Sequence, residues 1–441
     1  MSTYPIAMRV SINQKAVKRV EQGHPWIFVS DVLDTGGASP GAAVTVTGPR
    51  GQILGTAHYS STSQIALRML NGQPVAIDAD FFTRRIEAAL SHRQLVVQGS
   101  NAFRLIHAEG DLLPGLVVDN YDGHLVAQFL DQGMDAATPI VVQALSTLLK
   151  PKSILARNDV AVRRHESLPL ERKFLAGDLT DSVTIKMNGL SLEADLLAGQ
   201  KTGVYLDQRE NYLAASRYVR PHARALDCFT SSGGFALHLA RAGAEVDAVD
   251  SSGPALALAK RNASSNGLAE KIHWREADVP RLLKSFSTGR QKYDIVVLDP
   301  PAFAKSRGSV GEALRGYRDL NQRAFQLLEP GGILVTCSCS HHVSEDMLVE
   351  VIKEAAHAVG TGVRVLERIT QSRDHPVLLS VPETLYLKGL ILQILPRSTD
   401  SSLGVMTKNG TFQSSQGAGP GAGSDDDGSL PRAEPPVAPD A

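Results

Sequence analysis

Short runs of alternating apolar and polar residues fill the chain from residue 8 to residue 75. One pair of runs flanks a Gly-Pro-Arg-Gly turn at 48–51, and a further run follows at 63–70. Such alternation, interrupted by glycine and proline, is typical of strands that are buried on one face. It predicts a small β-barrel in this part of the chain.

The apolar spacing becomes helical at 81–97, because residues three and four positions apart share one face of a helix. The apolar residues on that face are Phe82, Ile86, Ala89 and Leu90. The segment 103–130 then predicts a strand, a turn and a strand, and 138–150 predicts a second helix. Together these patterns predict an α+β region over roughly 79–190, in which we find no catalytic motif.

From about residue 195, strand patterns alternate with helix patterns. The predicted strands are 224–229, 244–250, 271–278, 293–301 and 331–340, and helical patterns fill most of the sequence between them. This alternation predicts a doubly wound α/β fold built on a parallel sheet.

The composition of the chain limits the partners and the cellular compartment that can be expected for the protein. The 441 residues carry a formal net charge of −1, so the chain as a whole has no electrostatic attraction to a polyanion. Three cysteines argue against a disulfide framework and for a reducing compartment. We find neither the apolar pattern of a secretory signal nor a run of the ~18 apolar residues that a membrane helix needs. These features predict a soluble, cytoplasmic protein without a membrane partner.

One basic segment stands out locally. Lys15, Lys18 and Arg19 lie close in the sequence to Trp26 and Phe28. A basic surface with nearby aromatic rings suits a nucleic-acid partner. A solvated face with both rings in the core explains the same pattern, and both interpretations stay open.

We looked for candidate functional residues at the predicted strand ends, because ligands of an open parallel sheet bind beyond the carboxyl ends of the strands. The first strand leads into Gly233 and Gly234, where the backbone can approach a ligand closely. The second ends at Asp250, where a carboxylate can accept both hydroxyls of a ribose. No phosphate-binding glycine motif is present. A cofactor with a ribose and an adenine but no phosphate fits, and S-adenosylmethionine is such a cofactor.

The fourth strand ends at Asp299, before two prolines that cannot continue a ladder, and Phe303 follows nearby. The fifth strand should lie beside the fourth, which brings Cys337 and Cys339 close to Asp299. Side chains alternate along a strand, so both thiols face the same side and Cys339 lies nearer the rim.

Four roles compete for these thiols. A disulfide between residues i and i+2 has poor geometry, and a zinc site lacks a Cys-x-x-Cys pair, so we predict no metal. Burial as small apolar side chains is expected for Cys228 and Cys337. For Cys339, opposite a carboxylate at a strand end, a thiolate nucleophile is the better interpretation.

A thiolate and a carboxylate have a specific use together. Carbon 5 of cytosine or uracil is too weak a nucleophile to accept a methyl group directly. Attack of a thiolate at carbon 6 makes carbon 5 enamine-like, and an acid at N3 stabilises the charge that develops. Methylation of an exocyclic nitrogen needs no such cysteine.

The chain resembles a known family over about residues 8–396: the bacterial S-adenosylmethionine-dependent ribosomal RNA methyltransferases of the large-subunit methyltransferase I type. The matching stretches are GHPWIF, GTAHYSSTSQIALR, LIHAEGDLLPGLVVD, KTGVYLDQREN, LDCFTSSGGFALHLA, VDSSGPALALAKRNASSNG, LDPPAFAKS, GYRDLNQRAFQLLEPGGILVTCSCSH and DHPVLLSVPETLYLKG.

The resemblance implies three domains and a tail. They are a PUA-like RNA-binding β-barrel (1–77), a small central α+β domain (78–192) and a Rossmann-like class I methyltransferase domain (193–396). Residues 397–441 lie outside the resemblance. They are rich in Gly, Ser, Pro and Asp, which predicts a disordered tail.

The resemblance also implies a set of site residues. It makes Cys339 the nucleophile and Asp299 its partner, places Asp250 on the ribose and Asp278 on the adenine amino group, and puts Gly233 at the methionine end. The implied cofactor residues are Tyr205, Asp207, Gln208, Arg209, Asp227, Phe229, Gly233, Gly234, Asp250, Asp278 and Asp299.

Two local departures from the family pattern concern the substrate site. Ala302 stands where the family usually has a lysine, and His341 stands where it usually has a glycine. Like its relatives, the chain also lacks the second cysteine that other RNA cytosine-5 methyltransferases carry after the motif-IV proline. Another base must therefore remove the carbon 5 proton.

The predicted function is methylation of carbon 5 of a cytosine in large-subunit (23S) ribosomal RNA. One alternative is methylation of guanine at N2 or N7, for which Cys339 is dispensable. Another is an RNA-binding assembly factor with no catalytic role. Relatives with a PUA domain often pair, so a homodimer is among the expected partners, although the sequence carries no interface signature.

Overall fold

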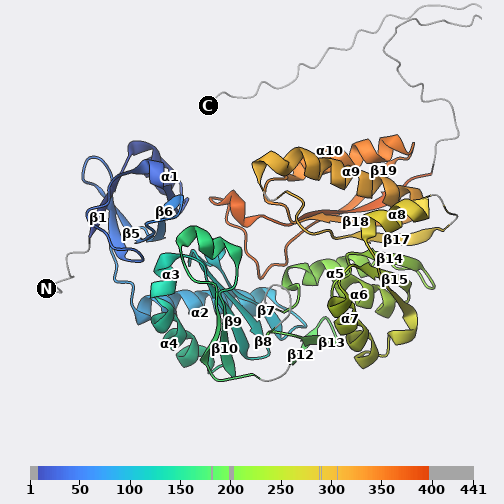
Figure 1. Cartoon of the computed structure of the whole chain (residues 1–441), viewed down its shortest axis with the longest axis horizontal. Coiled ribbons are helices and arrows are strands. Elements are labelled where there is room, and N and C mark those ends of the chain that lie inside the picture. The colour runs from blue at the N-terminus through green and yellow to red at the C-terminus, as the bar shows by residue number, and fades with distance from the viewer. Residues whose placement is uncertain are drawn as a thin grey trace, which may run out of the picture. The chain divides into compact units, whose positions relative to one another are not determined.

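The N-terminal strands form a six-stranded sheet in the order β2-β6-β5-β4-β1-β3 (Figure 1). These strands are β1 (Arg9–Ile12), β2 (Trp26–Phe28), β3 (Val32–Asp34), β4 (Ala43–Thr47), β5 (Ile53–Tyr59) and β6 (Ile65–Asn71). The computed structural model describes residues 8–179, 182–197, 203–287, 289, 291–304 and 306–396. The predicted disordered tail and two residues of the KTGVYLDQREN stretch, Lys201 and Thr202, lie outside them.

Helix α1 (Gln14–Glu21) follows β1 and was not indicated by the hydrophobic pattern. The Asn13 side chain accepts a hydrogen bond from the Ala16 N–H and so caps the helix. Only Ala16 and Val17 are buried, because the helix is eight residues long. A helix this short repeats its apolar face too few times to be recognised from spacing.

The central sheet has five strands in the order β11-β10-β9-β8-β7. Its elements are α2 (Ala79–Val96), β7 (Ala102–His107), β8 (Leu116–Tyr121), β9 (His124–Phe129), α3 (Gln132–Ala136), α4 (Thr138–Leu149), β10 (Ser153–Arg157) and β11 (Arg172–Ala176). The predicted helical face is confirmed for Phe82, Ile86 and Ala89, which are buried.

The segment 103–130 contains three strands, one more than its pattern predicts. Asp122 and Gly123 separate β8 from β9, and both have positive φ, at 52° and 87°. An Asp-Gly pair between two apolar runs is a strong signal for a two-residue hairpin, so the sequence did carry an indication of the additional strand.

The last sheet confirms the predicted α/β fold. Its order is β16-β15-β14-β17-β18-β20-β19, and the first five of these strands run parallel. The strands are β14 (Arg224–Cys228), β15 (Glu245–Asp250), β16 (Ile272–Glu276), β17 (Tyr293–Leu298), β18 (Leu328–Ser338), β19 (Val363–Thr370) and β20 (Lys388–Ile394). The sequence did not predict β19 and β20, and β20 joins β18 antiparallel.

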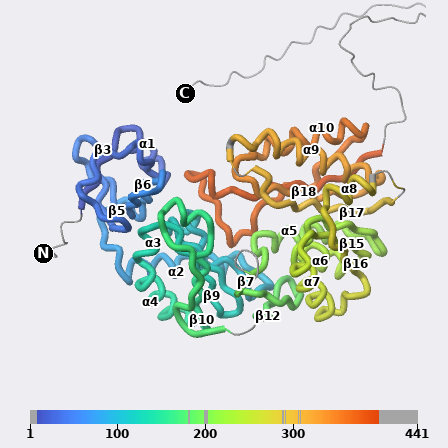
Figure 2. Tube along the Cα trace, viewed as in Figure 1, coloured from blue at the N-terminus to red at the C-terminus, as the bar shows by residue number. Residues whose placement is uncertain are grey.

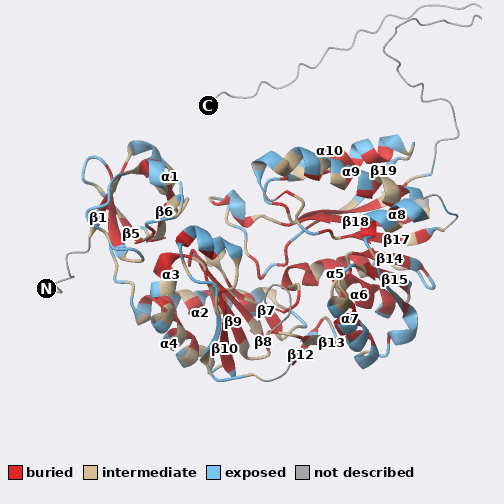
Figure 3. Cartoon of the chain, viewed as in Figure 1, coloured by how far each residue is buried: buried red, intermediate tan, exposed pale blue. Residues whose placement is uncertain are grey.

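Helices cover both faces of this sheet, as Figure 1 shows. They are α5 (Arg209–Ser216), α6 (Gly234–Arg241) and α7 (Gly253–Ser265) on one face, and α8 (Val279–Ser287), α9 (Val310–Leu327) and α10 (Glu345–Ala358) on the other. In Figure 3 the strands are mostly buried, whereas the outer sides of the helices are exposed.

The hairpin of β12 (Val183–Met187) and β13 (Leu190–Ala194) packs with the last sheet. Its residues Ile185 and Leu192 belong to the same hydrophobic cluster as Ala225 of β14 and Ala236 of α6. The cluster also includes Ala102 and Tyr121 of the central sheet, so the predicted domain boundaries stay a prediction.

The connection between β19 and β20, residues 371–387, is the orange-red loop that leaves the sheet in Figure 2. Asp374 on this loop is fully buried and accepts hydrogen bonds from the guanidinium of Arg209 and the backbone N–H of Arg104. Arg93 of α2 donates to the Asp374 carbonyl. The loop is therefore tied both to the central sheet and to the start of α5.

Among the described residues, no helix combines the length and the apolar character that crossing a bilayer requires.

Candidate active site at the strand ends

A cavity of ≈420 Å³ lies where β14, β15, β17 and β18 end. Eight of the predicted site residues line it: Tyr205, Asp207, Gln208, Phe229, Gly234, Asp250, Asp299 and Cys339. The other four predicted site residues do not line the cavity: Arg209, Asp227, Gly233 and Asp278. The rule that ligands bind beyond the carboxyl ends of parallel strands located Gly234, Asp250, Asp299 and Cys339, and the family resemblance supplied the other four.

Asp250 is held in place by the loops that follow two neighbouring strands. One carboxylate oxygen accepts the N–H of Ser231, at 2.8 Å, and the other accepts the N–H of Ser252, also at 2.8 Å. Each oxygen of a carboxylate can accept a second hydrogen bond. The geometry therefore leaves Asp250 able to receive the two hydroxyls of a ribose.

The turn after β14 has unusual backbone geometry. Phe229 and Ser231 are non-glycine residues with positive φ, at 63° and 50°, and Gly233 has φ 87°. Strained backbone of this kind persists only where the surroundings enforce it, and it concentrates at functional sites. Here it bends the chain so that the Ser231 N–H points at Asp250.

Glycine at position 234 is explained by packing. A Cβ there would lie 2.3 Å from the Tyr212 ring, which no real contact allows. Tyr212 itself lines the cavity and was not singled out from the sequence. The close approach that the double glycine predicts is therefore made by a tyrosine of the chain.

Asp227 shapes the same turn from beneath. One oxygen accepts from the Thr230 hydroxyl, at 2.5 Å, and from the Ala236 N–H, at 2.9 Å. The other oxygen is buried and has no hydrogen-bond donor among the described residues. Burial raises the pKa of Asp227 to about 7. Asp227 does not line the cavity, and its observed role is to hold the turn that borders it.

Two residues assigned by resemblance have other contacts. Asp278 accepts the N–H of Arg281 and so caps the first turn of α8. Arg209 is buried and forms an ion pair with Asp374. Asp207, by contrast, faces the cavity and accepts the hydroxyl hydrogen of Tyr386 at 2.8 Å.

The predicted pairing of the fourth and fifth strands is confirmed. β17 and β18 run parallel, with Leu298 opposite Thr336, so Asp299 and Cys339 both follow the ends of adjacent strands. Both side chains line the cavity. The Cys339 thiol lies 3.9 Å from the Pro300 carbonyl.

The three cysteines differ in accessibility. All are unbridged; Cys228 and Cys337 are fully buried, whereas Cys339 is partly exposed. Burial raises the pKa of both buried thiols well above the ordinary value. Cys339 is therefore the thiol that a ligand can reach.

The end of β18 is held by a network of hydroxyl groups and by one lysine. The sequence pattern predicted a role for none of these residues. Tyr317 of α9 hydrogen-bonds Ser338, at 2.9 Å, and Ser340, at 3.0 Å. Lys388 donates to the Ser340 carbonyl at 2.9 Å. The sequence carried two signals of this network: serines alternate with the cysteines, and one lysine stands in an otherwise apolar strand.

No group of three metal-ligating side chains occurs among the described residues.

Comparisons with known proteins agree with this fold. A family model described as S-adenosylmethionine-dependent methyltransferase matches residues 104–391, and one described as a PUA-like domain matches residues 10–71. Fold, site and matches together define an S-adenosylmethionine-dependent methyltransferase with a PUA-like domain. The predicted fold class and cofactor are thereby confirmed.

The chain belongs to the family of ribosomal RNA large subunit methyltransferase I. It is 40% identical to the protein of that name from Tolumonas auensis, over 88% of this chain and 99% of the relative. It is 37% identical to the Escherichia coli protein of that name, over 88% of this chain and 100% of the relative. The family resemblance seen in the sequence is confirmed.

Two solved structures share the fold. A putative methyltransferase from Streptococcus mutans has a TM-score of 0.76 at 18% identity, covering 88% of this chain and all of that one. A second, the putative methyltransferase SMU.776 in complex with SAH, has a TM-score of 0.76 at 19% identity with the same coverage.

Proposed function

We propose that the protein methylates carbon 5 of a cytosine in large-subunit ribosomal RNA, with Cys339 as the nucleophile. The observation that carries this proposal is the meeting of one accessible thiol and one carboxylate, Asp299, in a single cavity. The choice of ribosomal RNA rests on the names of relatives that are 37–40% identical.

The chemistry assigns a step to each of the two groups. The Cys339 thiolate attacks carbon 6 of the ring, while Asp299, as an acid, donates a hydrogen bond or proton to N3. S-adenosylmethionine supplies the methyl group that carbon 5 then accepts. A base removes the carbon 5 proton, and the electron pair released expels the thiolate. Pro300, Pro301 and Ala302 follow Asp299, so this base is not a second cysteine.

The cofactor site of the proposal is the turn after β14 together with the end of β15. Asp250 would accept the ribose hydroxyls, and Tyr205, Gln208 and Phe229 would flank the cofactor in the cavity. Asp227 and Gly233 would shape the turn, and Arg209 would support it through Asp374. The assignment of Asp278 to the adenine amino group rests on the family resemblance alone. Pairing of two copies stays a prediction.

The identity of the product tests this proposal. The protein should be incubated with S-adenosylmethionine and large-subunit ribosomal RNA that lacks modifications, and the RNA digested to nucleosides for mass spectrometry. We expect 5-methylcytidine. Methylguanosine instead would support transfer to N2 or N7 of guanine. Absence of any product, with no cofactor binding at ~100 µM, would support the assembly factor, since enzymes commonly work between 1 µM and 1 mM.

A further inference from the structure

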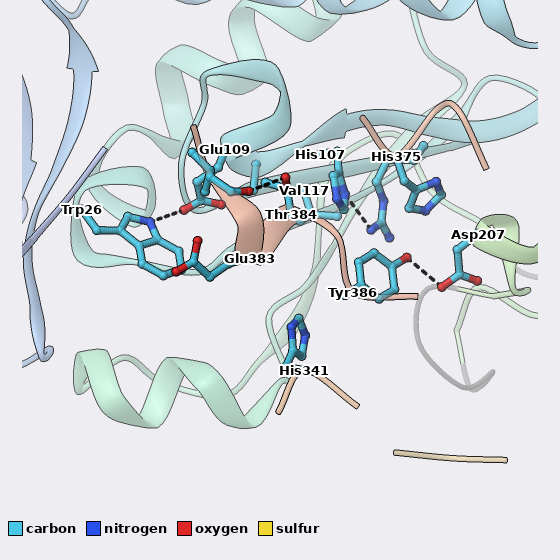
Figure 4. A pocket seen from close by; sticks show the side chains of 13 residues that line it. Trp26, His107, Glu109, Val117, Asp207, His341, His375, Glu383, Thr384 and Tyr386 are labelled. Carbon is cyan, nitrogen blue, oxygen red and sulfur yellow. Dashed lines mark hydrogen bonds between the residues drawn. The ribbon is translucent and has the colours of Figure 1, made fainter. Parts of the chain in front are cut away.

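A second cavity, of ≈460 Å³, adjoins the candidate active site and shares Asp207 with it. Figure 4 shows its ring-bearing walls. Trp26 comes from the N-terminal sheet, His107 from the central sheet, and His341, His375 and Tyr386 from the methyltransferase part. His341 is two residues from Cys339 in the sequence.

Four of these rings, those of His107, His341, His375 and Tyr386, lie next to one another, whereas Trp26 lies at the other end of the cavity (Figure 4). The His107 ring lies 5.1 Å from that of His375 and 6.0 Å from that of Tyr386, and the His341 ring lies 5.9 Å from Tyr386, measured between centroids. Burial, with cationic neighbours, lowers the pKa of His107 well below its ordinary value and lowers that of His341. Both imidazoles are therefore neutral at neutral pH and offer flat faces rather than positive charge.

The charges in the walls disfavour a phosphate. Arg104 is already paired with Asp119 through two hydrogen bonds of 2.8 and 3.0 Å. Glu109 accepts the Trp26 indole N–H at 2.8 Å, and Glu383 also lines the cavity. Carboxylates repel phosphate but accept hydrogen bonds from the amino and imino groups of a base. The cavity is thus suited to a nucleobase.

We propose that this cavity holds the base of a nucleotide that neighbours the target in the RNA strand. Sequence-specific RNA recognition commonly splays bases out and stacks them on aromatic side chains. The shared Asp207 and the closeness of His341 to Cys339 place this second base within one short stretch of RNA from the target. The inference rests on the proposed function insofar as RNA reaches Cys339.

Binding measurements with abasic RNA test the base site. The probe is a fluorescent RNA carrying the nucleotide that the protein methylates, with each flanking nucleotide replaced in turn by an abasic ribose. We expect one replacement to weaken binding to the native protein roughly tenfold, since a stacked base contributes that much or more. In Trp26→Ala and His341→Ala the same replacement should have little further effect.

His342→Ala is the matched control, because His342 adjoins His341 but does not line the cavity. It should bind each RNA as the native protein does. Trp26→Phe, which keeps a ring, should restore the sensitivity to the abasic position that Trp26→Ala loses. The proposal would be overturned if each abasic replacement weakened RNA binding equally in the native protein and in both alanine variants. Anisotropy reports binding whichever base is methylated, so this outcome is separate from failure of the proposed chemistry.

A different observation concerns Lys388, the first residue of β20. The residue is only 5% exposed, and it lies opposite Ser338 in the ladder with β18. The ammonium donates to the Ser340 carbonyl, and no aspartate or glutamate of the described chain forms an ion pair with it. Burial lowers the pKa of Lys388, whereas the charge on Cys339 acts in the opposite direction. A buried cation without a carboxylate partner needs another anion nearby.

We further infer that Lys388 is a positioning residue whose ammonium stabilises the Cys339 thiolate. The ammonium reaches the carbonyl of the residue directly after Cys339. Asp299 and Asp207 line the same cavity as Cys339, and a negative charge on either disfavours a thiolate. Tyr317 and the neutral His341 add no positive charge at this strand end. Lys388 is then the group that offsets the carboxylates.

The rate of alkylation of Cys339 by iodoacetamide, followed against pH, tests this role. Only the thiolate reacts, and an opposite charge close by lowers a thiol pKa by about 1–3 units. Lys388→Gln keeps a donor for the Ser340 carbonyl but removes the charge. We expect its alkylation at pH 7 to be at least about tenfold slower than in the native protein, with the difference vanishing at high pH. Lys388→Arg should restore most of the rate.

Cys339→Ala supplies the background, which should be small because Cys228 and Cys337 are fully buried. Cofactor binding and thermal melting of each variant show that it is folded. Coincident pH profiles for the native protein and Lys388→Gln would overturn the inference. The assay needs neither RNA nor methyl transfer, so it tests the role of Lys388 even if the product proves not to be 5-methylcytidine.

Discussion

Replacing Cys339 with alanine should abolish RNA methylation while leaving the affinity for S-adenosylmethionine unchanged. The thiol provides the electron pair that makes carbon 5 of the ring reactive, and the other two thiols of the chain are buried and cannot replace it. Loss of a catalytic nucleophile commonly costs on the order of 10³-fold or more in rate. Single-turnover methylation of ribosomal RNA, with calorimetry of cofactor binding, measures both quantities.

Cys337→Ala is the matched control, since it removes the same atom two residues away in the same strand. Cys337 is fully buried and should contribute to packing only, so this variant should keep most of the activity. A second readout uses RNA with 5-fluorocytosine at the target, which blocks removal of a proton from carbon 5. Native protein and Cys337→Ala should form a complex with it that survives denaturation, and Cys339→Ala should not. Undiminished methylation by Cys339→Ala would refute the proposed chemistry.

Replacing Asp374 with alanine should destabilise the protein by about 3–5 kcal/mol, the usual cost of leaving a buried charge without its partner. Arg209 and Asp374 are 1% and 0% exposed, and their hydrogen bonds are 3.1 and 3.2 Å long. The variant also removes the acceptor of the Arg104 N–H. Urea denaturation followed by circular dichroism measures the change in the free energy of unfolding.

An exposed ion pair gives the control for this effect. Lys353 and Glu350 are 62% and 61% exposed, and Glu350→Ala should change stability by less than about 1 kcal/mol. The double variant Arg209→Ala/Asp374→Ala should lose less than the sum of its single variants, because neither charge is then left alone. Additive losses would show that the pair is not coupled.

Asp374 should also contribute to the acid sensitivity of the fold. Burial alone would raise the pKa of Asp374, but His375 and Arg209 hold it below its ordinary value. A carboxylate with a lowered pKa in the folded state stabilises it above the pKa of the unfolded chain, about 3.9, and this stability is lost as pH falls below that value. Asp374→Asn should therefore weaken the loss of stability on acidification, which urea denaturation at a series of pH values measures.

Much of the site was predictable because strand ends are visible in sequence. Asp250, Asp299 and Cys339 each follow a recognisable apolar run, and parallel strands bring such positions to one edge. The partner of Arg209 was not predictable, since Asp374 lies 165 residues away on a loop without periodic pattern. The same holds for Lys388, whose strand pairs with β18 only through the fold.

Other misses have local causes. The eight residues of α1 repeat their apolar face too few times to be recognised. The hairpin at Asp122 and Gly123, by contrast, was signalled by its Asp-Gly pair, and that signal was overlooked. Trp26 left two interpretations open, a nucleic-acid surface or a core. In the structure it is partly buried, with its indole N–H on Glu109 in the wall of the second cavity. The contact that places Trp26 in this wall is made with Glu109, 83 positions away in the chain, so the sequence alone could not decide between the two interpretations.

The insertion of β20 between β18 and β19 has a consequence for the order in which the protein is made. The nucleophile Cys339 directly follows β18. One of the two neighbours of β18 is formed by residues 388–394, about fifty residues later in the chain. While the ribosome has not yet released that segment, β18 has an unpaired edge, and such edges invite association with other chains. Nascent chains generally fold from the N-terminal end. The N-terminal and central sheets can thus be complete while the strand end that carries Cys339 still awaits both its neighbour and Lys388.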